Sequence, residues 1–150
     1  AIAALRDLLI PEATVITPNL PEAADLLGFS EARDRDAMQA QAEALLDLGP
    51  QAVLLKGGHL STQESPDLLM SDGQVRWFDT ARVITTNTHG TGCTLSSALA
   101  SYLGQGHTVA RAVTEAKKYV SGAITAADQL SVGQGHGPVN HFWSFWGNNE

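Results

Sequence analysis

The sequence contains one cysteine, Cys93, among 150 residues. A lone cysteine excludes a disulfide within the chain and fits a reducing compartment. No apolar run reaches the ~20 residues that a transmembrane helix needs. No charged-then-apolar signal segment opens the chain. These absences lead us to expect a cytoplasmic protein that does not enter a membrane.

Basic residues are also scarce. There are 9 of them against 16 acidic residues, and the formal net charge is -7. A protein that binds nucleic acid through the phosphate backbone normally carries a basic face, and the longest basic run here is Lys117-Lys118. We therefore expect no nucleic-acid partner. A small anionic ligand remains compatible with the charge, because backbone amides and a metal ion can supply a local positive field.

Length and composition allow one domain with a sizeable core. The chain has 43% hydrophobic residues, a normal share for a globular domain. It begins at Ala1 without methionine, in a segment that reads as the end of a helix. We expect it to be the C-terminal part of a single domain, with an N-terminal half outside this sequence.

Strand-like and helical segments alternate along the chain. Buried strands are expected at 14–17 and 53–55, a further strand at 82–85, and a hairpin around Asp72-Gly73 between 67–70 and 74–78. Helices are expected at 1–9, 21–27 and 36–48, from Gly90 to about 103, and at 108–127. This order predicts an α/β fold with a mainly parallel sheet, helices on both faces and one β-hairpin. The aromatic residues near the C-terminus are expected to anchor that end by packing.

The clearest site motif is the segment NTHGTGCT, residues 87–94. Gly90 and Gly92 allow a close approach to a ligand, and the helix that follows presents amides without internal partners at its positive end. Such a turn suits phosphate oxygens. Neither the P-loop pattern nor the third glycine of the dinucleotide fingerprint is present. An ordinary strand-to-helix turn explains the residues equally well on physical grounds alone.

Cys93 is expected at the start of that helix. The positive end of a helix favours a thiolate, so the side chain could act as a general base or orient a hydroxyl group. A small, inert cysteine is the alternative.

Two further places lie at expected strand ends, where ligands of open α/β sheets gather. Asn19 and Glu22 offer oxygen atoms that could hold the water shell of Mg²⁺, although a glutamate that serves the helix dipole is the simpler reading. Lys56 could balance phosphate charge, and Gly57-Gly58 would let a nucleotide pass close to the backbone. A solvated lysine is the alternative. The five histidines form no recognisable zinc motif.

The order TPNLPEA, LLKGGH, a DG hairpin, NTHGTGCT and GHGPVNH resembles the hydroxymethylpyrimidine and phosphomethylpyrimidine kinases of thiamine biosynthesis, within the ribokinase-like superfamily. The resemblance covers nearly the whole chain. It implies a ribokinase-like fold and ATP-dependent phosphorylation of an aminopyrimidine alcohol and then of its monophosphate. It also implies Mg²⁺ as a second cofactor and a homodimer for the full-length protein.

The resemblance also implies roles for individual positions. Gly90, Thr91, Gly92 and Cys93 match the anion hole and the base, where most relatives carry aspartate in place of the cysteine. Asn19 and Glu22 match the N-x-x-E motif that organises magnesium. The nucleotide site is matched by Lys56, Gly57, Gly58, Thr88, Gly90 and Gly92.

One departure is large, because most of the family's pyrimidine pocket lies in an N-terminal half that this sequence lacks. We therefore expect the 150 residues alone to have little kinase activity. A pyridoxal kinase or hydroxyethylthiazole kinase of the same superfamily is one alternative function. A non-catalytic nucleotide-binding module is another, and a stable α/β domain with a glycine-rich loop and no ligand is a third.

Overall fold

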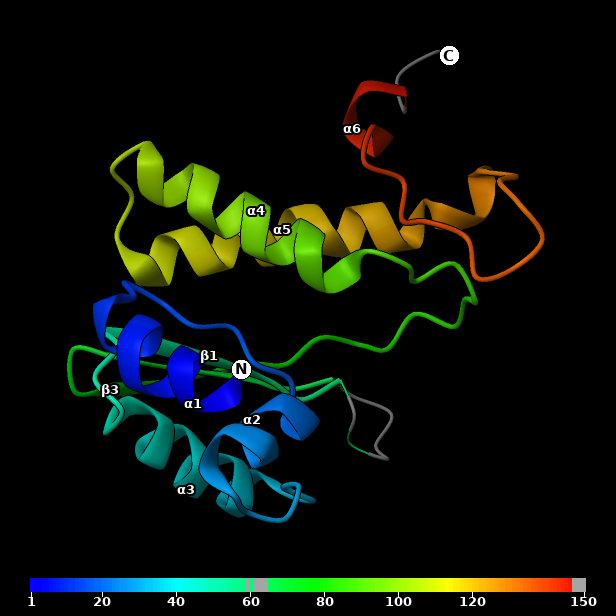
Figure 1. The fold of residues 1–150 in the computed structure, drawn as a ribbon. Helices are drawn as coiled ribbons and strands as arrows, with labels where there is room; N and C mark the ends of the chain where they lie inside the picture. Colours follow the sequence, from blue (N-terminus) through cyan, green and yellow to red (C-terminus); the bar gives the residue numbers. More distant parts are fainter. Residues whose placement is uncertain (59, 61–64, 147–150) are drawn as a thin grey trace. The chain divides into compact units, whose positions relative to one another are not determined.

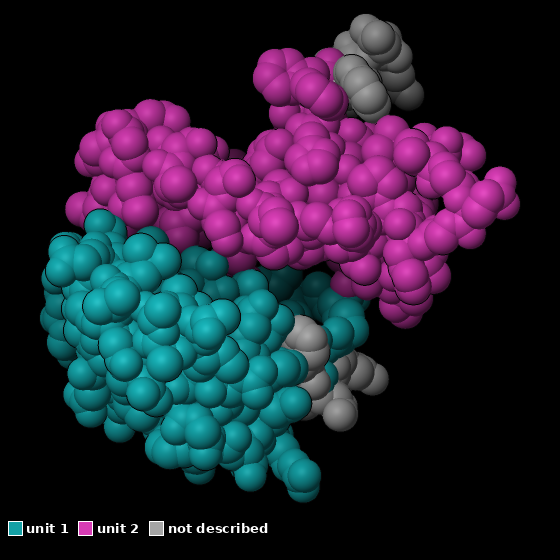
Figure 2. Space-filling view, in the orientation of Figure 1, with its two compact units in different colours: residues 1–82 teal, residues 83–150 magenta. Residues whose placement is uncertain are grey.

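A computed structural model of the chain describes residues 1–58, 60 and 65–146, and for Trp146 it describes the backbone only. The chain divides into two compact units, residues 1–82 and residues 83–150, which are coloured separately in Figure 2. Each unit is described by itself. Of the candidate site residues, Asn19, Glu22 and Lys56 belong to the first unit, and the glycine-rich loop belongs to the second.

The first unit opens with irregular helical turns and then forms two regular helices (Figure 1). The opening turns are α1 (Ile2–Ala4), a π-helical turn (Leu5–Leu9) and a 3-10 turn (Ile10–Glu12), and of these residues only Ile10 is buried. The regular helix α2 (Leu20–Leu27) ends at Gly28, whose φ of 70° is the left-handed conformation that glycine adopts without a Cβ penalty. The helix α3 (Arg35–Leu46) begins where the Asp34 side chain accepts a hydrogen bond from the Ala37 amide.

The core of the first unit lies between these helices and the sheet. Met38, Ala42 and Leu45 repeat at helical spacing on α3 and are all fully buried. They pack with α2 and with the strand residues Val53 and Leu55 in one hydrophobic cluster. This cluster fixes the ends of the strands that carry the candidate site residues.

The sheet of the first unit has three strands in the order β1-β2-β3. They are β1 (Ala52–Lys56), β2 (Asp67–Ser71) and β3 (Gln74–Phe78), and both pairings are antiparallel. The β2–β3 turn is formed by Asp72 and Gly73, with φ of 52° and 69°. Positive φ at both positions is typical of the tight hairpin turn, so the hairpin expected from the Asp-Gly pair is confirmed.

The α/β class with helices around a sheet is confirmed, but the strand pairing differs from the expected one. Parallel pairing occurs among the described residues as isolated bridges, and the expected strand 14–17 contributes only the bridge between Ile16 and Val53. The expected strand 82–85 does not form. Ile84 in that segment is 97% exposed, and a strand needs a neighbour to complete its hydrogen bonds. Strand direction depends on partners elsewhere in the chain, which periodicity does not reveal.

The second unit is built on two long helices, α4 (Thr91–Gly104) and α5 (Val109–Thr125), which pack against each other. Thr108 caps α5, and Val113, Ala116 and Val120 lie on its buried face, as their spacing predicts. A short 3-10 turn (Ala127–Gln129) follows, and the chain returns through a tail to α6 (Trp143–Trp146). No helix in the described part of the chain is long and apolar enough to span a bilayer.

Candidate functional site

In the first unit, the candidate residues Asn19, Glu22 and Lys56 come from neighbouring chain segments. Asn19 and Lys56 are partners in an isolated parallel bridge, and the Lys56 amide donates to the Pro18 carbonyl at 2.9 Å. The helix α2 begins directly after Asn19, and Glu22 lies in its first turn. The structure therefore brings these three residues to one edge of the first unit, as their place at strand ends predicts.

Asn19 and Glu22 form a reciprocal cap on α2. The Asn19 Oδ1 atom accepts from the Glu22 amide at 2.8 Å, and the Glu22 Oε2 atom accepts from the Asn19 amide at 2.8 Å. This capping box satisfies two amides and places a carboxylate at the positive end of the helix. The simpler interpretation of Glu22, a glutamate that stabilises the start of a helix, is therefore confirmed.

The same pair offers oxygen atoms of the kind that Mg²⁺ prefers. A carboxylate has about four lone-pair positions, and one hydrogen bond leaves others available. Glu22 is exposed, so these positions are open to water. No group of three or more His, Cys, Asp or Glu residues that could hold a metal occurs in the described part of the chain. The residues present fit an ion that keeps its waters and takes further oxygens from a phosphate, and do not fit a closed protein cage.

The paired glycines after Lys56 have different environments. A Cβ on Gly57 would lie 2.0 Å from the Pro66 carbonyl oxygen, and the Gly57 amide donates to the buried Asp67 Oδ1 at 2.9 Å. Gly57 is thus required for close backbone packing. Gly58 is exposed, and its carbonyl accepts from Arg82 at 3.0 Å. Tight backbone packing therefore explains Gly57, and of the two glycines the exposed Gly58 remains the candidate for contact with a nucleotide. His59, the last residue of LLKGGH, lies outside the described residues.

In the second unit, the glycine-rich turn forms the start of α4. Gly90 is the residue before the helix and has φ of 85°, and no side chain caps the helix. Thr94 is the first residue to bond within the helix pattern, through its amide to the Gly90 carbonyl at 2.8 Å. Among the described residues, no protein group accepts from the Gly92 or Cys93 amide. Two amides at the positive end of a 14-residue helix therefore lack a protein partner.

Thr88 and Thr91 hold the shape of this turn. The Thr91 hydroxyl and amide both donate to the Thr88 carbonyl, at 2.8 and 3.3 Å. Thr88 contributes its backbone carbonyl, and Thr91 contributes both its amide and its hydroxyl. These hydrogen bonds stabilise the turn in the absence of a side-chain cap.

Cys93 is exposed at the first turn of α4. Its side chain lines a cavity of about 630 Å³ within the second unit, whose wall also includes Thr94, Tyr119 and His141. The exposed thiol and the two unpartnered amides therefore lie in the same first turn of α4.

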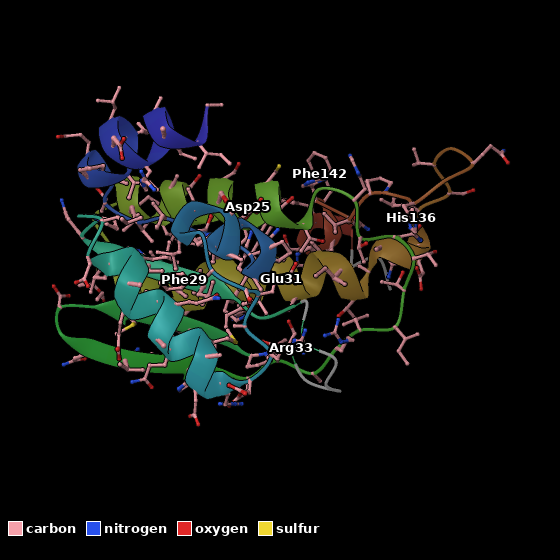
Figure 3. The ribbon with its side chains drawn as sticks, turned by 60° about the horizontal axis from the view of Figure 1, so that its bottom comes forward. Asp25, Phe29, Glu31, Arg33, His136 and Phe142 are labelled. Atoms are coloured by element: carbon pink, nitrogen blue, oxygen red, sulfur yellow. The ribbon has the colours of Figure 1, made fainter. Side chains whose placement is uncertain are left out.

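The tail that follows α5 forms hydrogen bonds with the residues just before the turn. The His89 amide donates to the Gly137 carbonyl at 3.1 Å, and the His89 carbonyl accepts from the Val139 amide at 3.2 Å. The Asn87 side chain accepts from the Gly137 amide at 3.0 Å and donates to Asp128 at 2.8 Å. His136, labelled in Figure 3, contacts the Thr86 carbonyl through Nδ1 at 3.1 Å. Sequence analysis found the GHGPVNH segment but not these contacts, and it missed Asp128.

The candidate residues are thus divided between two folded pieces. The magnesium and lysine positions lie in one, and the anion turn lies in the other.

The family described as phosphomethylpyrimidine kinase matches residues 1–140. A hydroxymethylpyrimidine/phosphomethylpyrimidine kinase of Salmonella typhimurium is 50% identical over 146 residues, which are 97% of this chain and 55% of the relative. This chain belongs to the phosphomethylpyrimidine kinase family. It spans about half the length of the curated relatives it matches.

Solved structures agree with this phosphomethylpyrimidine kinase assignment at the level of the fold. A Bacillus subtilis pyridoxal kinase, solved as an ADP complex, has a TM-score of 0.89 and 35% identity over 96% of this chain and 55% of its own. A Clostridium difficile phosphomethylpyrimidine kinase has a TM-score of 0.67 and 39% identity over 80% of this chain and 47% of its own. The expected ribokinase-like fold class is confirmed.

Proposed function

We propose that the protein containing this chain phosphorylates hydroxymethylpyrimidine and then its monophosphate, with ATP as the phosphoryl donor, in thiamine biosynthesis. The observation that carries the proposal is the uncapped first turn of α4, with two unpartnered amides beside an exposed Cys93, in a chain of the phosphomethylpyrimidine kinase family. Donors that are fixed in advance stabilise charge at little cost during the reaction.

The reaction is an in-line displacement at the γ-phosphorus. In the first phosphorylation the substrate hydroxyl oxygen forms a bond to that phosphorus, and in the second a phosphate oxygen of the monophosphate does so. In both, the bond to the β,γ-bridging oxygen breaks and ADP leaves with the electron pair. Such a reaction needs positioning and charge stabilisation more than covalent help. The Gly92 and Cys93 amides would donate hydrogen bonds to the phosphoryl oxygens and so stabilise the negative charge that develops on them.

In the first phosphorylation the hydroxyl proton must also leave. The Cys93 side chain would accept this proton or orient the hydroxyl, because it lies beside the amides proposed to bind the phosphate. Lys56 would add positive charge that stabilises the transferring phosphoryl group. Gly58, Thr88 and Gly90 would line the nucleotide, and Gly57 would keep the turn after Lys56 tightly packed.

Magnesium would be organised by Asn19 and Glu22. Its contribution when bound is to neutralise phosphate charge and orient the phosphate oxygens. The two residues would hold its water shell with the carboxylate positions that the capping box leaves open. The same pair of side chains that caps α2 would then also hold the water shell of the metal.

A pyridoxal kinase is a second candidate function. It is favoured by the TM-score of 0.89 with the pyridoxal kinase of Bacillus subtilis, which exceeds the 0.67 with a phosphomethylpyrimidine kinase structure. Similarity of fold is weaker evidence for a substrate than sequence identity is, and a relative named for the pyrimidine substrates is 50% identical to this chain.

The test is a substrate panel on the protein as its gene encodes it. ADP release is measured with hydroxymethylpyrimidine, its monophosphate, pyridoxal and hydroxyethylthiazole, each with ATP and Mg²⁺. The expected result is turnover of both pyrimidines, with kcat/KM for pyridoxal far lower. Preference for pyridoxal would favour the second candidate. ATP binding without turnover of any acceptor would indicate a nucleotide-binding module.

A further inference from the structure

The tail segment 136–141, with the sequence HGPVNH, contacts the residues on both sides of the candidate phosphate turn, at 86–89 before it and at Thr94 after it. It lies beside residues 86–89 through the backbone bonds of His89 with Gly137 and Val139. Pro138 is the partner of His89 in a parallel bridge. A segment about 50 residues away in sequence therefore completes the loop that precedes α4.

The tail segment is itself firmly fixed to α5. Asn140 is 1% exposed, its amide donates to the Ala123 carbonyl at 2.9 Å, and its side chain donates to the Ala126 carbonyl at 3.4 Å. The Tyr119 hydroxyl donates to the His141 carbonyl at 2.8 Å. The tail segment is therefore held by a 17-residue helix that packs against α4 through its buried face.

The last contact of the tail segment falls next to Cys93. The Nε2 atom of His141 lies 3.0 Å from the Thr94 hydroxyl, and Thr94 is only 7% exposed. Thr94 follows Cys93 directly, and its amide makes the first hydrogen bond of α4. The His141–Thr94 contact therefore acts on the residue where the unpartnered amides end and the helix begins.

We propose that His141 and Thr94 are positioning residues for phosphoryl transfer, and that the tail segment holds the amides of Gly92 and Cys93 in the orientation that the phosphate needs. This inference rests on the proposed function and assigns a role in it to the GHGPVNH motif. Neither residue is required to touch the substrate. A catalytic group that is displaced by about 1 Å can lose ~100-fold in rate, so a supporting hydrogen bond has measurable consequences.

Thr94→Val is the central variant, because it removes the hydroxyl and keeps the shape of the side chain. Thr94→Ser restores the hydroxyl. His141→Phe removes the other partner, and the double variant Thr94→Val/His141→Phe tests whether the two act as one unit. Thr114→Val is the matched control, because the Thr114 hydroxyl bonds only the Ala110 carbonyl on its own helix at 2.9 Å.

The assay uses the protein as its gene encodes it, with kcat and KM for ATP measured for each variant and thermal unfolding used to confirm folding. We expect Thr94→Val and His141→Phe each to lower kcat about tenfold, roughly one hydrogen bond's worth of transition-state stabilisation. The double variant should lose no more than either single one, and Thr94→Ser and Thr114→Val should stay near the unchanged protein. A folded Thr94→Val protein with full kcat would overturn the inference, as would losses that multiply in the double variant.

The same proteins separate this inference from the proposed function. If the unchanged protein phosphorylates neither pyrimidine, the proposed substrate has failed, and the tail segment is then tested by calorimetric titration with ATP. Weaker ATP binding in Thr94→Val, restored in Thr94→Ser, supports the positioning role. Equal ATP affinity in all three proteins overturns it.

Discussion

Asn19 and Gly90 each precede a helix, and the two helices begin in different ways. Asn19 and Glu22 satisfy the opening amides of α2 with their own side chains. At Gly90 no side chain is available, so the opening amides of α4 remain open to a ligand. A polar side chain that caps a helix also removes its capacity to bind an anion there. The start of α2 is therefore stabilised by the protein itself, whereas the start of α4 has amides available to bind an anion.

Cys93→Ala is expected to lower kcat by ~100-fold or more, the usual contribution of a positioned acid or base, with little change in ATP affinity. The reason is that the amides of residues 92 and 93 remain when the thiol is removed. Cys93 is exposed, so thermal unfolding should hardly change. Steady-state kinetics on the full protein provide the measurement. An unaltered kcat would remove Cys93 from the proton transfer.

Glu22→Gln separates the two roles of that side chain. Glutamine can still accept from the Asn19 amide, so the loss of unfolding free energy should stay below ~1 kcal/mol. The loss of charge should raise the Mg²⁺ concentration needed for half-maximal rate. Asp36→Asn, in the first turn of α3, is the matched control and should leave that concentration unchanged. If Glu22→Gln behaves as the control does, Glu22 serves the helix alone.

At the scale of elements, the turn between β1 and β2 offers a sharp comparison of two adjacent glycines. Gly57→Ala would force a methyl group against the Pro66 carbonyl, whereas a Cβ on Gly58 meets, within the part of the chain that the structure describes, only the Ser65 hydroxyl at an ordinary 3.4 Å. We expect Gly57→Ala to cost about 1–3 kcal/mol or more, as overpacking does, and Gly58→Ala to cost far less. Denaturant unfolding of both variants gives the comparison, and equal losses would show that the turn relaxes freely.

The short helix α6 is anchored to α5 through Trp143. Its ring packs on Gly122, where a Cβ would lie 2.2 Å from the ring, and its Nε1 donates to the Tyr119 carbonyl at 3.1 Å. Phe142, labelled in Figure 3, and Phe145 are 57% and 79% exposed. The expected aromatic anchor is therefore confirmed for Trp143 and does not extend to Phe145.

Gly122→Ala should displace the Trp143 ring from its packing position on α5, because the added methyl group would clash with the ring. Tryptophan emission should shift toward the red as the indole meets water, and protease cleavage near the C-terminus should become faster. Gly104→Ala, at the end of α4 where a Cβ meets nothing within 4 Å, should leave both readouts unchanged. Emission that stays constant in Gly122→Ala would mean that the ring finds another site on α5.

Local signals in the sequence predicted the local features of these elements. The helix expected at 21–27 corresponds to α2, Asp72-Gly73 predicted the hairpin, and Gly90-Thr91-Gly92 predicted the open start of α4. The direction of the strands and the tail contacts were not predictable in this way. Both depend on residues that are distant in sequence, and the Asn87–Gly137 bond joins positions 50 apart. Periodicity and capping rules do not report such pairings.

At the scale of the molecule, this chain accounts for 55% of the length of the Salmonella relative. The two units carry the candidate residues for ATP and Mg²⁺, and the resemblance implies that much of the pyrimidine pocket lies elsewhere. We expect residues 1–150 alone to show little or no turnover beside the full-length Salmonella enzyme under the same assay. Equal turnover would mean that the pocket is contained in these residues. The expected homodimer of the full protein stays a prediction, which sedimentation can test.

The reciprocal cap at Asn19 and Glu22 has a consequence for genetic work on this enzyme family. In a complementation screen, loss of growth at either position would conflate poor accumulation of the protein with impaired chemistry, because the same two side chains cap α2 and, in the proposed function, organise the metal. Scores from such a screen become informative at these two codons only when protein abundance is recorded for each allele.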